Sequence, residues 1–347
     1  MHAVDEGRPG LNNARCFGGA PASGAVRRAP RRTFDSTTER SQGIVSIDWA
    51  RFENRHCQVF LSFFNEDSML RRMPCVAIRL SVTAMVLAVS LNSGEQSAPK
   101  LPVVSGVPRA DQNSRIAHEQ LLNKARTGRI DIYFEGDSIT RRWGCSDAQY
   151  RDLLANWKTN FFGWNAADFG WGGDRVQNIL WRLETGELDG VSPRIIVLLA
   201  GTNNLRDTTS TADQDALVTE ITDGIRSILN VMQQKAPKAT ILLTGITPRK
   251  DRQGGTTLMP SINAINNRLA MLADGRRIRF FNINHQLAGA DGKLFDGMTV
   301  DGLHLSVKGY QVWADALKPV FIELLGPPAS VDHAPPPTGD PGARSAP

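Results

Sequence analysis

Short apolar runs alternate with longer amphipathic stretches between residues 111 and 326 of this chain. Four runs end at a glycine or a turn, as strands buried on both faces do, and a fifth is weaker. The predicted strands are 130–134, 195–200, 240–244 and 278–283, with 164–169 as the weaker one. The predicted helices are 114–125, 147–160, 174–183, 213–235, 261–273 and 307–325. This alternation predicts an α/β fold, a parallel sheet with helices on both faces.

Particular residues mark where the predicted helices begin and where the folded domain ends. Asp213 and Ser261 precede apolar periodic stretches, so we expect them to be N-caps. Residues 92–110 are rich in Ser, Gly and Pro and are expected to form a linker. Residues 327–347 are Pro-rich without apolar periodicity, which predicts a disordered tail.

Residues 69–91 have the pattern of a secretory signal peptide. Arginines precede an apolar stretch of about a dozen residues that ends in small side chains, and this is too short to span a bilayer comfortably. Signal peptides begin a chain, so we expect translation to start at Met69 or Met73 and residues 1–68 to be an over-extended or disordered segment. The alternative is a real Arg-rich extension followed by a buried element. The first interpretation predicts a secreted or periplasmic protein without stable membrane insertion.

Charge and cysteine content narrow the class of protein further. Residues 1–90 hold twelve Arg, no Lys and eight acidic residues, whereas the remainder holds 28 basic and 27 acidic residues. The nearly neutral body gives no electrostatic reason to expect nucleic-acid binding. Cys145 is the one cysteine after the leader, so neither an intramolecular disulfide nor a cysteine-based metal site is expected there.

Three predicted strands end in residues that could carry chemistry. The first ends in Gly136-Asp-Ser138, which presents a hydroxyl at a strand-to-helix turn, although an ordinary turn with a helix cap has the same sequence. The second ends in glycines, so the Gly173 N–H can point into a cleft. The third ends at Asn203, whose amide can donate to an oxyanion, though loop asparagines are usually turn formers. Parallel sheets gather chemistry at this edge.

Asp301 and His304 lie just before the last predicted helix. Their spacing lets the carboxylate reach the imidazole Nδ1 and fix its tautomer, although Asp-x-x-His is common by chance. His118 is expected at the surface and His285 to be structural. The histidines show no zinc spacing, and we expect neither a metal nor a cofactor.

Together the four blocks resemble SGNH (GDSL-like) hydrolases, in the same order along the chain. The blocks are Gly136-Asp-Ser138, Gly173, Gly201-Thr-Asn203 and Asp301-x-x-His304. The run 169–188 is similar to the subgroup of the platelet-activating-factor acetylhydrolase catalytic subunits and their bacterial relatives. The resemblance implies a three-layer α/β/α sandwich, flavodoxin-like, with about five parallel strands.

The resemblance also implies the role of each site residue. Ser138 would be the nucleophile, His304 its base and Asp301 the residue that orients His304. The N–H groups of Ser138 and Gly173 and the amide of Asn203 would form the oxyanion hole. Arg142 stands where many relatives have Gly and would narrow the acyl pocket. Trp143 and Trp171 are candidates for the substrate cleft, although a core position is the alternative.

The expected activity is hydrolysis of esters with a short acyl group, which we expect to be acetyl. A carbohydrate is the preferred alcohol, and the substrate is a small-molecule or carbohydrate ester. A lysophospholipase or arylesterase of the same fold is an alternative. A non-catalytic carbohydrate-binding protein is a second alternative, against which all four blocks keep chemically competent residues. The sequence does not indicate an oligomeric state.

Overall fold

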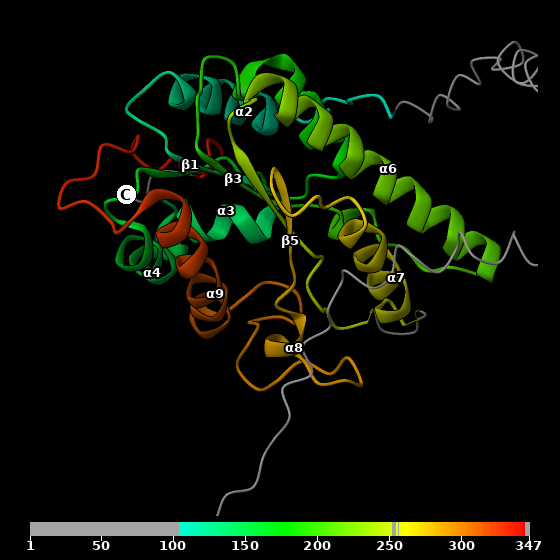
Figure 1. Cartoon of the computed structure of the whole chain (residues 1–347). Helices are drawn as coiled ribbons and strands as arrows, with labels where there is room; N and C mark the ends of the chain where they lie inside the picture. Colours follow the sequence, from blue (N-terminus) through cyan, green and yellow to red (C-terminus); the bar gives the residue numbers. More distant parts are fainter. Residues whose placement is uncertain (1–103, 252–254, 256, 344–347) are drawn as a thin grey trace, which may run out of the picture. The chain divides into compact units, whose positions relative to one another are not determined.

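A five-stranded parallel sheet forms the centre of the molecule, as predicted. The computed structural model describes residues 104–251, 255 and 257–343. Its strands lie in the order β2-β1-β3-β4-β5, the doubly wound order of flavodoxin-like folds (Figure 1). Their bounds are β1 Ile132–Gly136, β2 Ala166–Asp168, β3 Ile195–Leu199, β4 Thr240–Thr244 and β5 Ile278–Phe281. All neighbouring pairs are parallel. The weaker fifth strand is therefore present, as β2.

Alternate strand residues belong to two separate apolar cores. Tyr133 of β1 packs into one core, whereas Ile132 and Phe134 pack into the other. Because successive strand side chains point to opposite faces, each face needs its own layer of helices. Helices α2, α5, α6 and α7 supply the first core, and α3, α4, α8 and α9 supply the second. Figure 1 shows α6 and α9 on opposite sides of the sheet. The predicted α/β/α sandwich is confirmed.

Six helices agree with the predicted ranges in their bodies and differ at their ends: α2 Gln112–Ala125, α4 Arg151–Phe161, α5 Val176–Arg182, α6 Thr211–Lys235, α7 Met259–Ala270 and α9 Val307–Leu325. Two further helices, α3 Ser138–Gly144 and α8 Asn284–Leu287, lie outside the predicted ranges. The prediction that Asp213 is an N-cap is wrong. Ser210 caps α6 by accepting from the Asp213 N–H, and Asp213 lies in the first turn. Ser261 is also not a cap, since it is buried inside α7 and its hydroxyl accepts from Gln214.

The prediction of a disordered tail is wrong for residues 327–343, which we call the C-terminal strap. The strap runs along the domain as an extended segment held by backbone hydrogen bonds (Figure 1). Ala329 N–H donates to Gly163, Arg129 N–H donates to His333, and Ser146 N–H donates to Thr338. Proline sequences have few conformations to lose on folding, so such a segment needs no apolar periodicity to be ordered. Pairing with distant loops gives no local sequence signal.

Residues 104–110, predicted as part of a linker, lie on the domain. Val107 N–H donates to Gln177 at 2.9 Å, and Val107 accepts from the Asn178 side chain at 2.9 Å. Both partners are on α5, and Asp111 then caps α2 by accepting from Ser114. The remaining predicted linker, the signal peptide at 69–91 and residues 1–68 lie outside the described residues. Within the described part of the chain, no helix has the length and hydropathy needed to cross a membrane.

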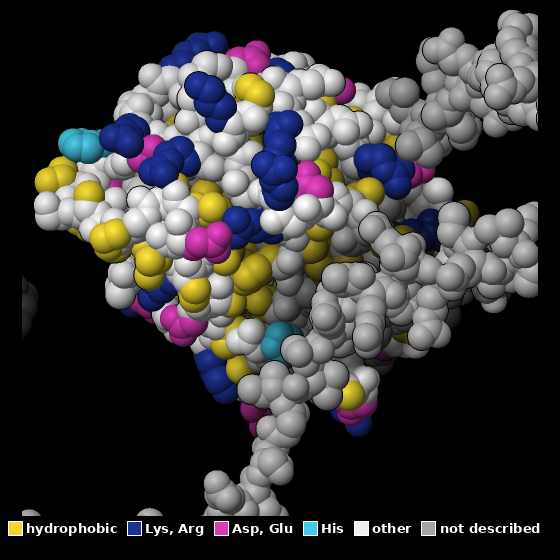
Figure 2. All heavy atoms as spheres, in the orientation of Figure 1, with side chains coloured by type: hydrophobic (Ala, Val, Ile, Leu, Met, Phe, Trp, Pro, Cys, Tyr) yellow, Lys and Arg dark blue, Asp and Glu magenta, His cyan; other side chains and the backbone are white. Residues whose placement is uncertain are grey.

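Lys and Arg side chains are spread over the face of the domain seen in Figure 2, with acidic side chains between them. Neither sign of charge occupies that face alone (Figure 2).

Candidate active site

Ser138 is the first residue of α3, directly after β1. The turn that presents it depends on Gly136, because a Cβ there would lie 2.2 Å from Thr140 Oγ1 and 2.5 Å from the Leu199 carbonyl oxygen. Asp137 caps the helix through Oδ1, which accepts from the Ile139 N–H at 2.9 Å. Ser138 itself stays half-buried at the carboxyl edge of the sheet. Its hydroxyl is therefore held in place by a turn that only glycine fits.

His304 and Asp301 meet Ser138 at this edge. Ser138 Oγ lies 2.9 Å from His304 Nε2, and His304 Nδ1 lies 2.6 Å from Asp301 Oδ2. The other carboxylate oxygen, Oδ1, accepts from the backbone N–H groups of Leu303 and His304 at 3.0 and 2.8 Å. A carboxylate can only accept, so Nδ1 donates to it and Nε2 is left as an acceptor for the serine hydroxyl. This geometry can move a proton from Ser138 to His304.

Helix α9 fixes the distance between the base and Ser138. The Tyr310 hydroxyl, on α9, donates to the Ile139 carbonyl of α3 at 2.5 Å. On the other side of the loop, Lys250 N–H donates to Gly302 at 2.7 Å. The loop that carries Asp301 and His304 is thus held from two directions.

The imidazole is poised to be neutral near pH 7. Burial lowers the pKa of His304 below its ordinary value, and the positive charges of Arg142 and Arg249 lower it further. The hydrogen bond to Asp301 opposes this shift by stabilising the protonated ring. Burial raises the pKa of Asp301, but the N–H groups of His304 and Leu303 bring it below its usual value. Asp301 is therefore a carboxylate whenever His304 acts as a base.

Gly173 and Asn203, the other predicted site residues, lie on adjacent turns. Gly173 has a φ of 78°, in the left-handed region that favours glycine. Asn203 lies in a short 3₁₀ turn (Thr202–Asn204) after β3, and its Nδ2 donates to the Asp174 carbonyl at 2.8 Å. An amide carries two hydrogens, so the second is available to an oxyanion. Within the described part of the chain, neither Ser138 N–H nor Gly173 N–H donates to another protein group.

Arg142 faces the carboxylate of the base pair. Its Nη1 lies 3.7 Å from Asp301 Oδ2, and its guanidinium lies 5.1 Å from the ring centroid of Tyr150. These contacts place positive charge beside the Asp301–His304 pair. The expectation that Arg142 narrows the acyl pocket stays a prediction.

Trp143 and Trp171 do not line a cleft beside Ser138. Trp143 is fully buried in the core, where its ring stacks on Tyr310 and Trp313. Trp171 is 7% exposed, its indole N–H donates to Ser114 Oγ at 2.7 Å and its ring lies under the Arg141 guanidinium. Both tryptophans stand next to site residues in the sequence because of packing. Trp143 belongs to α3 and fills the core, and Trp171 packs against α2 through Ser114.

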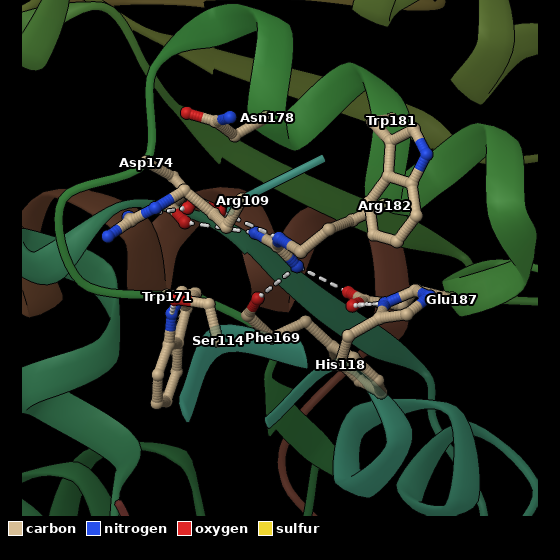
Figure 3. A network of polar contacts seen from close by, with 12 residues as sticks. Arg109, Ser114, His118, Phe169, Trp171, Asp174, Asn178, Trp181, Arg182 and Glu187 are labelled. Carbon is tan, nitrogen blue, oxygen red and sulfur yellow. Dashed lines mark hydrogen bonds and ion pairs between the residues drawn. The ribbon is translucent and has the colours of Figure 1, made fainter. Parts of the chain in front are cut away.

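A cluster of buried charges around Arg182 was not predicted from the sequence. Arg182, 3% exposed, pairs through Nε with Asp174 Oδ2 at 2.7 Å (Figure 3). Its Nη2 pairs with Glu135 Oε1 at 2.6 Å. Arg182 also contacts Glu187, which pairs with His118 Nδ1 at 2.7 Å. His118 is therefore buried, and the expectation of a surface position is wrong. The available signal was Arg182 itself, a charge among the core-facing positions of α5.

Burial raises the pKa of Glu135, whereas the Arg182 charge opposes that shift. Burial likewise raises the pKa of Cys145 to about 12, so this thiol is a packing residue and a poor nucleophile. Among the residues that the structure describes, no three His, Cys, Asp or Glu side chains are grouped so as to hold a metal ion.

A hollow of about 760 Å³ lies between α7, α8 and the loop that follows α8. Its lining mixes hydrogen-bonding groups with apolar ones and includes Asn263, Asn284, His285, Asp291, Met259 and Phe295. Pro248 borders the hollow. Two residues later, Lys250 N–H donates to Gly302 in the loop that carries Asp301 and His304, which we call the base loop. Residues 248–250 thus run from the border of the hollow to the base loop.

Comparison with known proteins identifies several similar chains. The pattern of the GDSL-like lipase/acylhydrolase family matches residues 134–312. The human platelet-activating factor acetylhydrolase IB subunit alpha1 is 28% identical over 234 residues, which cover 67% of this chain and 93% of the relative. The rat subunit alpha1 is 30% identical over 233 residues, covering 67% and 92%. A GDSL-like lipase structure from Bacteroides thetaiotaomicron is 22% identical with a TM-score of 0.48, covering 62% of this chain and 98% of that one.

Proposed function

Because this chain belongs to the GDSL-like lipase/acylhydrolase family and is a carboxylic ester hydrolase, we propose that it cleaves short-chain esters through an acyl-enzyme on Ser138. The observation that supports this most directly is the relay from Ser138 to His304 and from His304 to Asp301, with contacts of 2.9 and 2.6 Å. A neutral imidazole facing a hydroxyl at this distance is the arrangement that serine hydrolases use.

In the proposed reaction Ser138 Oγ attacks the ester carbonyl carbon while its proton passes to His304 Nε2. The carbonyl oxygen becomes an anion, which the N–H groups of Ser138 and Gly173 and the amide of Asn203 stabilise. When the tetrahedral intermediate collapses, the alcohol leaves with the proton from His304. A water molecule then gives a proton to the same imidazole as its oxygen attacks the acyl carbon. The carboxylic acid leaves when the bond to Ser138 Oγ breaks, and Oγ takes the proton back from His304. No step requires a metal or a cofactor.

We propose acetyl as the acyl group and a carbohydrate as the alcohol. The acetyl assignment is supported by the relatives, which are named acetylhydrolases. The hollow beside the base loop supports a hydroxyl-rich alcohol, because asparagine, histidine and aspartate side chains line it together with Phe295. Sugars are bound by such mixtures of hydrogen-bonding and apolar groups.

The test is hydrolysis of p-nitrophenyl esters from acetyl to octanoyl, together with acetylated sugars, acetylxylan and a platelet-activating-factor-type phospholipid. We expect the rate to fall as the acyl chain lengthens and acetylated carbohydrate to exceed the phospholipid. Octanoyl esters cleaved faster than acetyl esters would contradict the short-acyl assignment, and a faster phospholipid would contradict the carbohydrate. A fluorophosphonate should label wild type and not Ser138→Ala; labelling of the variant would mean that another residue is the nucleophile.

A further inference from the structure

The turn of Gly172, Gly173 and Asp174 is held by its last residue. The Asp174 side chain is completely buried, and two arginines approach it from different directions (Figure 3). Arg182 Nε lies 2.7 Å from Oδ2, and Arg109 Nη1 lies 3.3 Å from Oδ1. The Asp174 backbone carbonyl accepts from Asn203. Asp174 therefore connects the Gly173 N–H with the Asn203 amide, two of the three proposed oxyanion donors.

Arg109 lies against the glycines of this turn. Its Nη1 donates to the Gly172 carbonyl at 2.9 Å and would be 3.1 Å from a Cβ at Gly173. Its Nη2 pairs with Asp111 at 3.1 Å, and its side chain is 31% exposed. Arg109 belongs to the segment before α2 that Val107 attaches to α5, outside the residues that match the family pattern. Arg109 is thus held by Asp111 and by the contacts of Val107 with α5 while its guanidinium contacts the turn.

We propose that Arg109 is a positioning residue for the oxyanion hole, an inference that rests on the proposed esterase function. Two successive glycines give the turn more backbone freedom than any other pair of residues. Oxyanion donors act only when they are held at the position where the charge develops, and a displacement of 1 Å can cost about 10² in rate. The planar guanidinium reaches the Gly172 carbonyl and the Asp174 carboxylate together, which fixes the peptide plane that carries the Gly173 N–H.

The first test is the kinetics of Arg109→Met, which removes the guanidinium and keeps an apolar stem. We expect kcat for p-nitrophenyl acetate to fall by about 10- to 10²-fold with little change in KM. Arg109→Lys should recover part of kcat, because the ammonium can reach one acceptor but not both. Arg126→Met, on an exposed arginine at the end of α2, is the matched control and should keep wild-type kcat. An unchanged kcat in Arg109→Met would overturn the proposal.

The second test distinguishes positioning from a general loss of stability. If Arg109 acts through the oxyanion hole, Arg109→Met should cost much less in an Asn203→Ala background, where the hole is already impaired. Equal fold-losses in both backgrounds would overturn the proposal.

A third measurement does not depend on activity. Amide hydrogen exchange of the peptide covering residues 170–175 should be faster in Arg109→Met than in Arg126→Met. Unchanged exchange in this peptide would refute the positioning role of Arg109 even in an enzyme with no measurable turnover. A wild-type protein that neither labels with a fluorophosphonate nor hydrolyses esters would instead contradict the proposed function.

Discussion

The imidazole of His304 lies between two opposite electrostatic influences. Burial and the nearby arginines favour the neutral ring, whereas Asp301 favours the protonated ring. The activity of such a base is lost as the pH falls through its pKa, so the acidic limb of the rate profile should lie below the ordinary histidine value. The balance between these influences can be changed one residue at a time.

Replacing Asp301 by Asn should lower kcat by about 10⁴, as the same change does in other serine-hydrolase triads. The amide can no longer select the tautomer in which Nε2 accepts from Ser138. Without the carboxylate the pKa of His304 falls further, so the acidic limb should move to lower pH. Initial rates between pH 4 and 9 measure both effects, and an acidic limb that moves upward would contradict this role for Asp301.

Replacing Asn203 by Ala should reduce kcat by about 10²–10³ with little change in KM, because its amide acts only when the carbonyl oxygen becomes anionic. The acidic limb should match that of wild type, since Asn203 does not contact His304. Steady-state kinetics separate the two parameters. A large rise in KM at constant kcat would show that Asn203 binds the ground-state substrate instead.

The polar site residues could be read from the sequence because each stands at the end of an apolar run. Ser138, Gly173 and Asn203 follow β1, β2 and β3, and the carboxyl ends of parallel strands lie at one edge of the sheet. The sequence has no comparable signal for where the aromatic side chains lie. Whether Trp143 faces a cleft or the core depends on Tyr310 and Trp313, more than 160 residues away.

Among the elements, the C-terminal strap lies beside the edge of the sheet. Strand β2 pairs on one side with β1, and Ala334–Pro337 border the same cavity as Ala166 and Ala167 of that strand. Prolines cannot donate to a sheet ladder, so a strap of this composition covers an edge without extending it. The strap could not be predicted from periodicity, because its contacts are backbone hydrogen bonds to distant loops.

Ending the chain after residue 326 should therefore lower the melting temperature by about 5–10 °C, since each lost hydrogen bond contributes about 1 kcal/mol. Exposure of the β2 edge should also increase self-association. Thermal unfolding and size-exclusion chromatography measure the two effects. Removing only residues 344–347 is the matched control, because it leaves the contacts of the strap in place. Equal melting temperatures for the two deletions would contradict a stabilising role.

Helix α5 carries the buried Arg182, whose loss should be costly. Arg182→Met should lower the free energy of unfolding by about 3–5 kcal/mol, because it leaves buried carboxylates without a counter-charge. Arg206→Met is the control, since Arg206 is 45% exposed and pairs with Asp213 and Glu220, which are 30% and 43% exposed, so its loss should cost at most about 1 kcal/mol. Urea unfolding of both variants gives the comparison. Similar losses would mean that the cluster contributes no more than surface pairs do.

For the molecule as a whole, we propose that the enzyme is exported and that residues 69–91 are removed. The residues that we assign to the site and its supports lie within residues 104–343, downstream of the segment proposed to be removed. N-terminal sequencing of secreted material should find a start near residues 89–99. Residues upstream of Met69 in that material would contradict both the signal peptide and the internal start.

The two apolar cores differ in when the ribosome supplies them. The core under α6 is drawn mainly from a continuous part of the chain, whereas the core under α9 joins β1, α3 and α4 to residues 283–321. Domains fold as their parts emerge during synthesis, so the second core must wait for the last helix. That helix also follows directly after His304. Ser138 is made early but has no base until residues 301–304 and the helix that follows them have been made, so a nascent chain that stops short of them carries a nucleophile without its base.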